Sequence, residues 1–157
     1  MQGKMRRKDR AMNVEEAYSF LAAAPVGRLA TISENGYPYV VPVHFVCLDN
    51  KIYFHCAQEG HKLDNIKKTP FVCFEADEMI GIINADHPCD TSTRYKSVVI
   101  FGKARVVEDE SIKIHALKEI IRKYVPESAN APLVPEILDA SAVVEIEIEQ
   151  MTGKASR

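Results

Sequence analysis

The sequence lacks the features that mark membrane-spanning and secreted proteins. No stretch approaches the roughly 20 consecutive apolar residues that a membrane-spanning helix needs. The basic start of the chain is not followed by the apolar core of a secretory signal, so we expect a cytoplasmic protein. The four cysteines form no CxxC pair; they are Cys47, Cys56, Cys73 and Cys89. In a reducing compartment such cysteines are expected to act as small apolar side chains, without disulfides.

Several motifs of nucleotide-binding and catalytic proteins are also absent. There is no GxGxxG fingerprint and no GxSxG elbow, so neither a Rossmann fold nor an α/β-hydrolase is supported. Thr152-Gly153-Lys154 lacks the rest of a P-loop, and we interpret it as a tail. The candidate metal ligands lack the close paired spacing of a structural zinc site, which predicts no metal centre; they are His44, His55, Cys56, His61, His87 and Cys89.

The length and the charge favour one ordinary globular domain over residues 1–157. The net charge of −2 gives no overall basic field, so neither nucleic acid nor a membrane surface is an expected partner. The beginning of the chain is an exception, with five basic residues in seven positions: Lys4, Arg6, Arg7, Lys8 and Arg10. The sequence alone allows two interpretations, a solvated arm or a segment that closes over an anionic ligand or a partner subunit.

Four segments carry helical signals. Asn13 and Glu16 have the spacing of a capping box, and Pro25 ends the helix that follows them. Residues 109–124 show the clearest apolar stripe, with Pro126 beyond its end. Shorter helices are predicted over 59–68 and 132–138.

The remaining segments predict strands. Residues 26–32, 37–48 and 51–56 are expected to form an antiparallel meander, because short turns at 34–36 and 49–50 separate them. Residues 71–76 and 95–107 are further strands, with a bulge or barrel corner at Gly102, and 78–93 reads as irregular. Residues 142–149 alternate, which predicts a strand whose glutamates face water. The fold class is therefore mostly β, an antiparallel barrel of six or more strands with peripheral helices.

The stretch from Tyr53 to Lys62 carries the strongest chemical signal. It is a strand, a loop with Gly60 and the start of a helix, where backbone amides are unpaired and carry partial positive charge. His61 and Lys62 are unfavourable for the helix dipole at that end, and a bound anion such as phosphate would remove the conflict. The alternative is a surface lysine beside a solvated histidine.

Three other sites have a functional and a structural interpretation. Pro42 lies in a long strand, which indicates a sheet edge, a bulge or a flat ligand against the backbone. His55 closes an apolar strand as either a structural group or a catalyst. Tyr95 and Ser97 open a strand and are either ligand contacts or an ordinary strand start.

Taken in order, these stretches resemble the pyridoxamine 5′-phosphate oxidase-like split barrels, most closely the nitroimidazole-resistance reductases. The resemblance covers nearly the whole chain, through 5–10, 27–31, 38–43, 53–62, 73–75, 95–98, 102–104 and 152–154. It implies a homodimer with two flavin sites at the subunit interface, holding FMN, with FAD as an alternative. The closing residues 150–157 show no arginine-rich end of the kind that pyridoxamine phosphate oxidases use, which speaks against that substrate.

The resemblance also assigns residues to the flavin. Val41, Pro42 and Val43 would lie along the isoalloxazine ring by backbone contacts. The phosphate end would be held by a second group: His55, Ala57, His61 and Lys62. Tyr95 and Ser97 would contribute from nearby, or from the second subunit, and His55 is the candidate catalytic residue. The implied activity is reduction of a small electron-poor acceptor such as a nitroimidazole. A non-catalytic flavin-storage protein and a haem-binding split barrel, with His44, His55 or His61 as the iron ligand, are the alternatives.

Overall fold

One antiparallel sheet organises the chain, in a computed structural model that describes residues 5–156. The sheet has seven strands in the order β2-β1-β5-β6-β7-β4-β3. The strands are β1 (Gly27–Ile32), β2 (Pro38–Val43), β3 (Val46–Leu48), β4 (Lys51–Ala57), β5 (Phe71–Ile83), β6 (Ser92–Val106) and β7 (Ser141–Ser156). The helices are α1 (Val14–Ala23), α2 (His61–Lys68), α3 (Glu110–Tyr124) and α4 (Pro135–Ala140). The expected mostly-β class with peripheral helices is confirmed.

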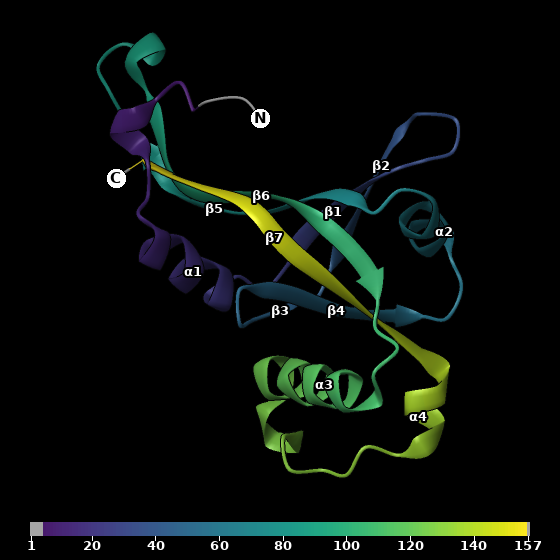
Figure 1. Ribbon diagram of the computed structural model, residues 1–157. Coiled ribbons are helices and arrows are strands. Elements are labelled where there is room, and N and C mark those ends of the chain that lie inside the picture. Colours follow the sequence, from purple (N-terminus) through teal and green to yellow (C-terminus); the bar gives the residue numbers. More distant parts are fainter. Residues whose placement is uncertain (1–4, 157) are drawn as a thin grey trace.

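The sheet curves around the main core, and the helices lie at its periphery (Figure 1). Helices α1 and α2 pack their apolar sides on the concave face, where Leu21, Leu63 and Phe74 meet. A second core lies between β4, β7 and α3, around Val143 and Leu117. In the described residues β2 and β3 have only one neighbouring strand each, so the sheet leaves two edges. No helix in the described part is long and apolar enough to cross a membrane.

The two antiparallel pairings of the predicted meander are confirmed, β1 with β2 and β3 with β4, but its middle strand is not one continuous strand. The run 37–48 breaks at His44 and Phe45 into β2 and β3, and only β2 pairs with β1. Phe45, at this break, is fully buried in the main core. Strand β4 pairs with β3 on one side and, on the other, with β7 near the end of the chain.

The predicted irregular segment 78–93 is wrong at both of its ends, over half of its length. Strand β5 continues to Ile83 and β6 begins at Ser92, so the two form a long hairpin with Met79 paired to Tyr95. Figure 1 shows this hairpin beside the segment that precedes α1 and the last residues of β7, where Tyr95 pairs with Ser156. Backbone hydrogen bonds order the hairpin even though Met79, Ile80 and Ile82 remain exposed, so it leaves no alternating sequence pattern.

Two expectations at the end of the chain need correction. Residues 152–154, interpreted as a tail, belong to β7 and pair with β6. Glu145, expected to face water, is 3% exposed because α3 covers that face of the sheet. Its carboxylate accepts a hydrogen bond of 2.6 Å from the Tyr53 hydroxyl and lies 2.9 Å from Arg105 Nε. The predicted bulge at Gly102 is confirmed by a shift in the β6–β7 register.

Candidate functional site

The start of α2 has no side-chain cap in the described residues. Gly60 precedes the helix at φ 144°, a backbone conformation that side chains disfavour. The Gly60 carbonyl oxygen accepts hydrogen bonds from the backbone amides of Leu63 and Asp64, with N···O distances of 2.9 and 3.1 Å. The amides of His61 and Lys62 precede these in the first turn, where helix geometry leaves amides without an intrahelical acceptor. Together with the helix dipole, this end favours a negatively charged group.

The first two side chains of α2 are held in different ways. His61 Nε2 lies 2.9 Å from Ser33 Oγ, and the ring packs edge-on against Tyr39 with centroids 4.6 Å apart. Lys62 is half-buried, and its positive charge acts on Cys56. Burial raises the pKa of the Cys56 thiol, and the positive charge of Lys62 partly offsets that rise.

Strand β2 forms the wall beside this helix end. It is an edge strand, as Pro42 indicated, and Pro42 itself is exposed and pairs with Arg28. Val41 and Val43 turn their half-buried side chains toward the core. Because β1 is its only partner in the described residues, β2 has backbone amides and carbonyls on its other edge for a ligand.

His55 and Ala57 lie at the exposed end of β4, four residues before α2 in the case of Ala57. Partial burial, and secondarily the charge of His44, lower the pKa of His55 below its ordinary value. His44 is fixed in turn by stacking on Tyr124, with ring centroids 4.3 Å apart. His55 is therefore neutral at pH 7, with one ring nitrogen able to donate a hydrogen bond and the other to accept one.

Tyr95 and Ser97 do not lie with the other predicted site residues in one protomer. They are on β6, and strands β1 and β5 separate them from β2. Hydrogen bonds from Lys154 and then Arg10 lower the pKa of Tyr95, and the Lys154 ammonium lies 5.7 Å from its ring centroid. The basic start thus reaches Tyr95 through Arg10, whereas Lys4 lies outside the described residues.

The structure adds two residues that the sequence did not indicate, Ser33 and Tyr39. Both come from the β1–β2 hairpin and orient His61. A hollow of about 470 Å³ opens beside them, lined by Ser33, Glu34, Asn35, Tyr37, Pro38, Tyr39 and His61. A smaller hollow of about 330 Å³ lies on the other side of the same ring, between Glu34 and α2.

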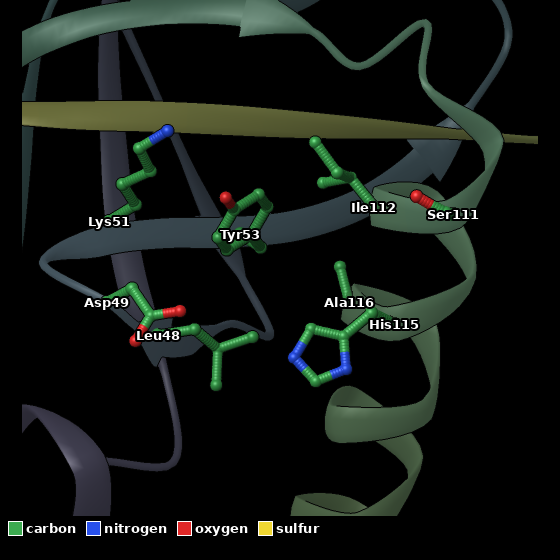
Figure 2. A pocket seen from close by; sticks show the side chains of 8 residues that line it. All are labelled: Leu48, Asp49, Lys51, Tyr53, Ser111, Ile112, His115 and Ala116. Carbon is green, nitrogen blue, oxygen red and sulfur yellow. The ribbon is translucent and has the colours of Figure 1, made fainter.

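Another hollow, of about 340 Å³, lies between the β3–β4 turn and α3 (Figure 2). Figure 2 shows the His115 ring directed toward Leu48 and Asp49. None of the predicted site residues lines this hollow, and Lys51 on its rim is paired with Glu145 at 3.2 Å. The predicted site residues on α2 and β2 therefore lie outside this hollow.

Metal-ligating side chains do not gather at one place in the described residues. Over residues 5–156 no group of three or more His, Cys, Asp or Glu side chains is arranged to hold a metal ion. All four cysteines are free; Cys47, Cys56 and Cys73 are half-buried and Cys89 is exposed.

Solved structures similar to this chain include proteins named for flavins and for nitroimidazole resistance. A candidate 5-nitroimidazole antibiotic resistance protein from Bacteroides thetaiotaomicron is 26% identical with a TM-score of 0.80, covering 92% of this chain and 85% of that one. An FAD-binding protein from Mesorhizobium loti is 25% identical with a TM-score of 0.69, covering 94% and 98%. The flavocytochrome Anf3 of Azotobacter vinelandii shares the fold, with a TM-score of 0.86 and 21% identity. The match covers 98% of this chain and 72% of that one.

The sequence family gives the assignment. No curated protein matches the chain at a significant level. Residues 13–155, from the cap of α1 almost to the end of β7, match the family described as pyridoxamine 5′-phosphate oxidase. The chain therefore belongs to the pyridoxamine 5′-phosphate oxidase-like split-barrel family.

Proposed function

We propose that this protein binds a flavin nucleotide and, as a flavin-dependent oxidoreductase, reduces a small electron-poor acceptor such as a nitroimidazole. The observation that carries the proposal is the start of α2, where Gly60, His61 and Lys62 form a basic helix end without a side-chain cap. The flavin phosphate would accept hydrogen bonds from the first-turn amides and from the Lys62 ammonium. The name of the similar Bacteroides protein supports the choice of acceptor.

The ring of the flavin would lie along β2. Its polar edge needs backbone donors and acceptors. In the described residues no second strand competes for those of β2 at Val41 and Val43, and Pro42, which has no N–H, can offer only its carbonyl. Ala57 and His55 would contact the flavin from the end of β4, which leads into α2. FMN satisfies these contacts, and FAD differs only in the group beyond the phosphate.

A homodimer would complete the site. The convex face of the sheet exposes Ile32, Val40 and Phe71, which are 46%, 56% and 56% exposed. Burying these side chains against a second copy would be favourable. Tyr95 and Ser97, which are remote from α2 in one protomer, would then reach the flavin of the partner.

The bound flavin supplies the electron transfer, while the protein supplies orientation, hydrogen bonds and protons. His55 is the candidate residue for orienting the acceptor and supplying a proton. Its neutral imidazole, stabilised by partial burial, can orient a polar acceptor group and hold a proton near it.

The first test is the absorbance spectrum of purified protein, with mass analysis of any released chromophore. We expect the spectrum of a bound flavin. In anaerobic assays with reduced flavin, we expect the protein to reduce a nitroimidazole. The variant His55→Gln should reduce it more slowly while still binding the flavin. A colourless protein that takes up no added flavin at micromolar concentration contradicts the proposal. Flavin binding without turnover of any acceptor indicates storage, and a Soret band lost with one histidine indicates haem.

A further inference from the structure

The turn of the β1–β2 hairpin lies beside the start of α2 and is built around two tyrosines. Tyr37 is 72% exposed, directly after Gly36 at φ 83°. Its amide donates a hydrogen bond of 3.2 Å to Asn35 Oδ1, and its carbonyl accepts one of 2.8 Å from the Ser33 amide. The backbone of this turn is therefore well fixed, while the large aromatic ring that it carries is left in water.

The hollow of about 470 Å³ beside this turn has the walls of an aromatic-base site. Tyr37, Tyr39, Pro38 and the His61 ring give flat or apolar surfaces on which a planar base can stack. Asn35 and the hydroxyl of Ser33 supply polar atoms at its margin. Its size falls in the usual range of about 300–1,000 Å³ for small-molecule sites.

The charges around the hollow favour a neutral ligand group there. Glu34 on its rim is paired with Lys68 at 2.5 Å, which offsets the carboxylate charge. The basic groups lie around α2 instead, with Lys62 in its first turn and Lys67 and Lys68 in its last. The smaller hollow on that side has Lys67, Lys68 and Asp64 in its lining and no aromatic side chain besides His61.

His61 connects the two regions. It begins α2 at the proposed phosphate site, and the same ring lines the hollow. The bond to Ser33 and the contact with Tyr39 fix this ring between them. A ligand whose phosphate lies at the helix start can therefore continue past His61 into the hollow.

We propose that this hollow binds the adenosine end of FAD, with Tyr37 stacked on the adenine, so that the protein prefers FAD to FMN. The inference rests on the proposed flavin site, which supplies the phosphate beside His61. FMN would leave the hollow empty, and the preference for FAD comes from covering the exposed Tyr37 ring.

The test is titration of the flavin-free protein with FMN and with FAD, followed by flavin fluorescence, for the parent, Tyr37→Ala and Tyr37→Phe. We expect the parent and Tyr37→Phe to bind FAD about tenfold more tightly than FMN, a difference of about 1.4 kcal/mol. Tyr37→Ala should remove this preference with the affinity for FMN unchanged. Ile137→Ala, which truncates a 52% exposed side chain on α4, is the control and should change neither affinity.

The outcomes separate this inference from the function on which it depends. If the parent binds neither flavin, the proposed function fails. If it binds FMN and FAD equally and Tyr37→Ala changes neither, the flavin site stands and the adenosine site is wrong. Equal losses of FMN and FAD affinity in Tyr37→Ala would also overturn the adenosine site, because Tyr37 would then act on the part that the two flavins share. If Tyr37→Ala weakens NADH or NADPH binding and leaves FAD unchanged, the hollow belongs to the electron donor and the choice of FAD is wrong.

Discussion

Ser33 Oγ and His61 Nε2 are 2.9 Å apart, although the two residues are separated by 28 positions in the sequence. Ser33 follows β1 and is nearly buried, whereas His61 begins α2 and is exposed. The bond therefore joins an exposed side chain of α2 to a buried residue at the end of β1. It also engages one ring nitrogen of His61, so Ser33 restricts the orientation of the imidazole at the proposed phosphate site.

Ser33→Ala should weaken flavin binding through His61. Losing the hydrogen bond frees the ring, and we expect a loss of about 0.5–1.5 kcal/mol in binding free energy. The measurement is a double-mutant cycle with His61→Ala, because a positioning role makes the two effects non-additive. If the losses in flavin affinity simply add, Ser33 acts independently of His61 and the positioning role is wrong.

Lys62→Ala should weaken the binding of FMN and of FAD alike. A charge-assisted hydrogen bond to phosphate contributes about 1.5–3 kcal/mol, so the dissociation constant should rise roughly 10- to 150-fold. Lys67→Ala is a matched control, since it removes the same charge from an exposed position in the last turn of α2. Affinity equal to the parent in Lys62→Ala would show that the phosphate lies elsewhere.

Local signals in the sequence predicted the elements whose geometry is decided within a few residues. The capping box at the start of α1 is present as expected, with the Glu16 amide donating to Asn13 Oδ1 at 2.7 Å and the Asn13 amide donating to Glu16 Oε2 at 3.3 Å. The start of α2 after Gly60 was likewise predictable, because glycine and the following apolar spacing are local.

Pairings between distant strands could not be predicted in the same way. Tyr53 and Glu145 lie 92 positions apart, and their bond depends on β4 pairing with β7. Alternation alone gave Glu145 a solvent-facing position, since it cannot show that α3 covers that side. The same limit applies to the site, where the contiguous residues from His55 to Lys62 were indicated, but Ser33 and Tyr39 approach His61 only through the fold.

Gly102→Ala should destabilise the fold. A Cβ at Gly102 would lie 2.1 Å from the Glu147 carbonyl oxygen, so the β6–β7 bulge must shift to accept it. We expect a loss of about 1–3 kcal/mol in the free energy of unfolding, measured by urea denaturation. The control is Gly81→Ala in the β5–β6 hairpin, where the nearest atom, Arg94 Nη2, is 3.9 Å away. Equal stability of Gly102→Ala and the parent would show that the bulge adapts freely.

The ion-pair network at Glu145 should make the free energy of unfolding depend on pH in the acidic range. Burial alone would raise the pKa of this carboxyl, but hydrogen bonds from Tyr53, Arg105 and Lys51 lower it below its ordinary 4.5. The unfolded chain therefore binds the proton first as the pH falls. The stabilisation by the carboxylate is complete above pH 4.5 and is lost as the pH falls through the lower folded pKa.

Glu145→Gln should remove this part of the acid sensitivity. At pH 6 the variant should lose about 1–3 kcal/mol of unfolding free energy, because the hydrogen bonds to a charged group become neutral ones. Below pH 4.5 the gap to the parent should narrow, since the unfolded parent then binds a proton at Glu145 that the folded parent takes up only at its lower pKa. Urea denaturation at pH 6, 4.5 and 3.5 measures both effects, with the exposed Glu147→Gln on the same strand as control. A gap that stays constant across this range would mean that the folded and unfolded pKa values of Glu145 are equal, and that the surrounding hydrogen bonds only offset its burial.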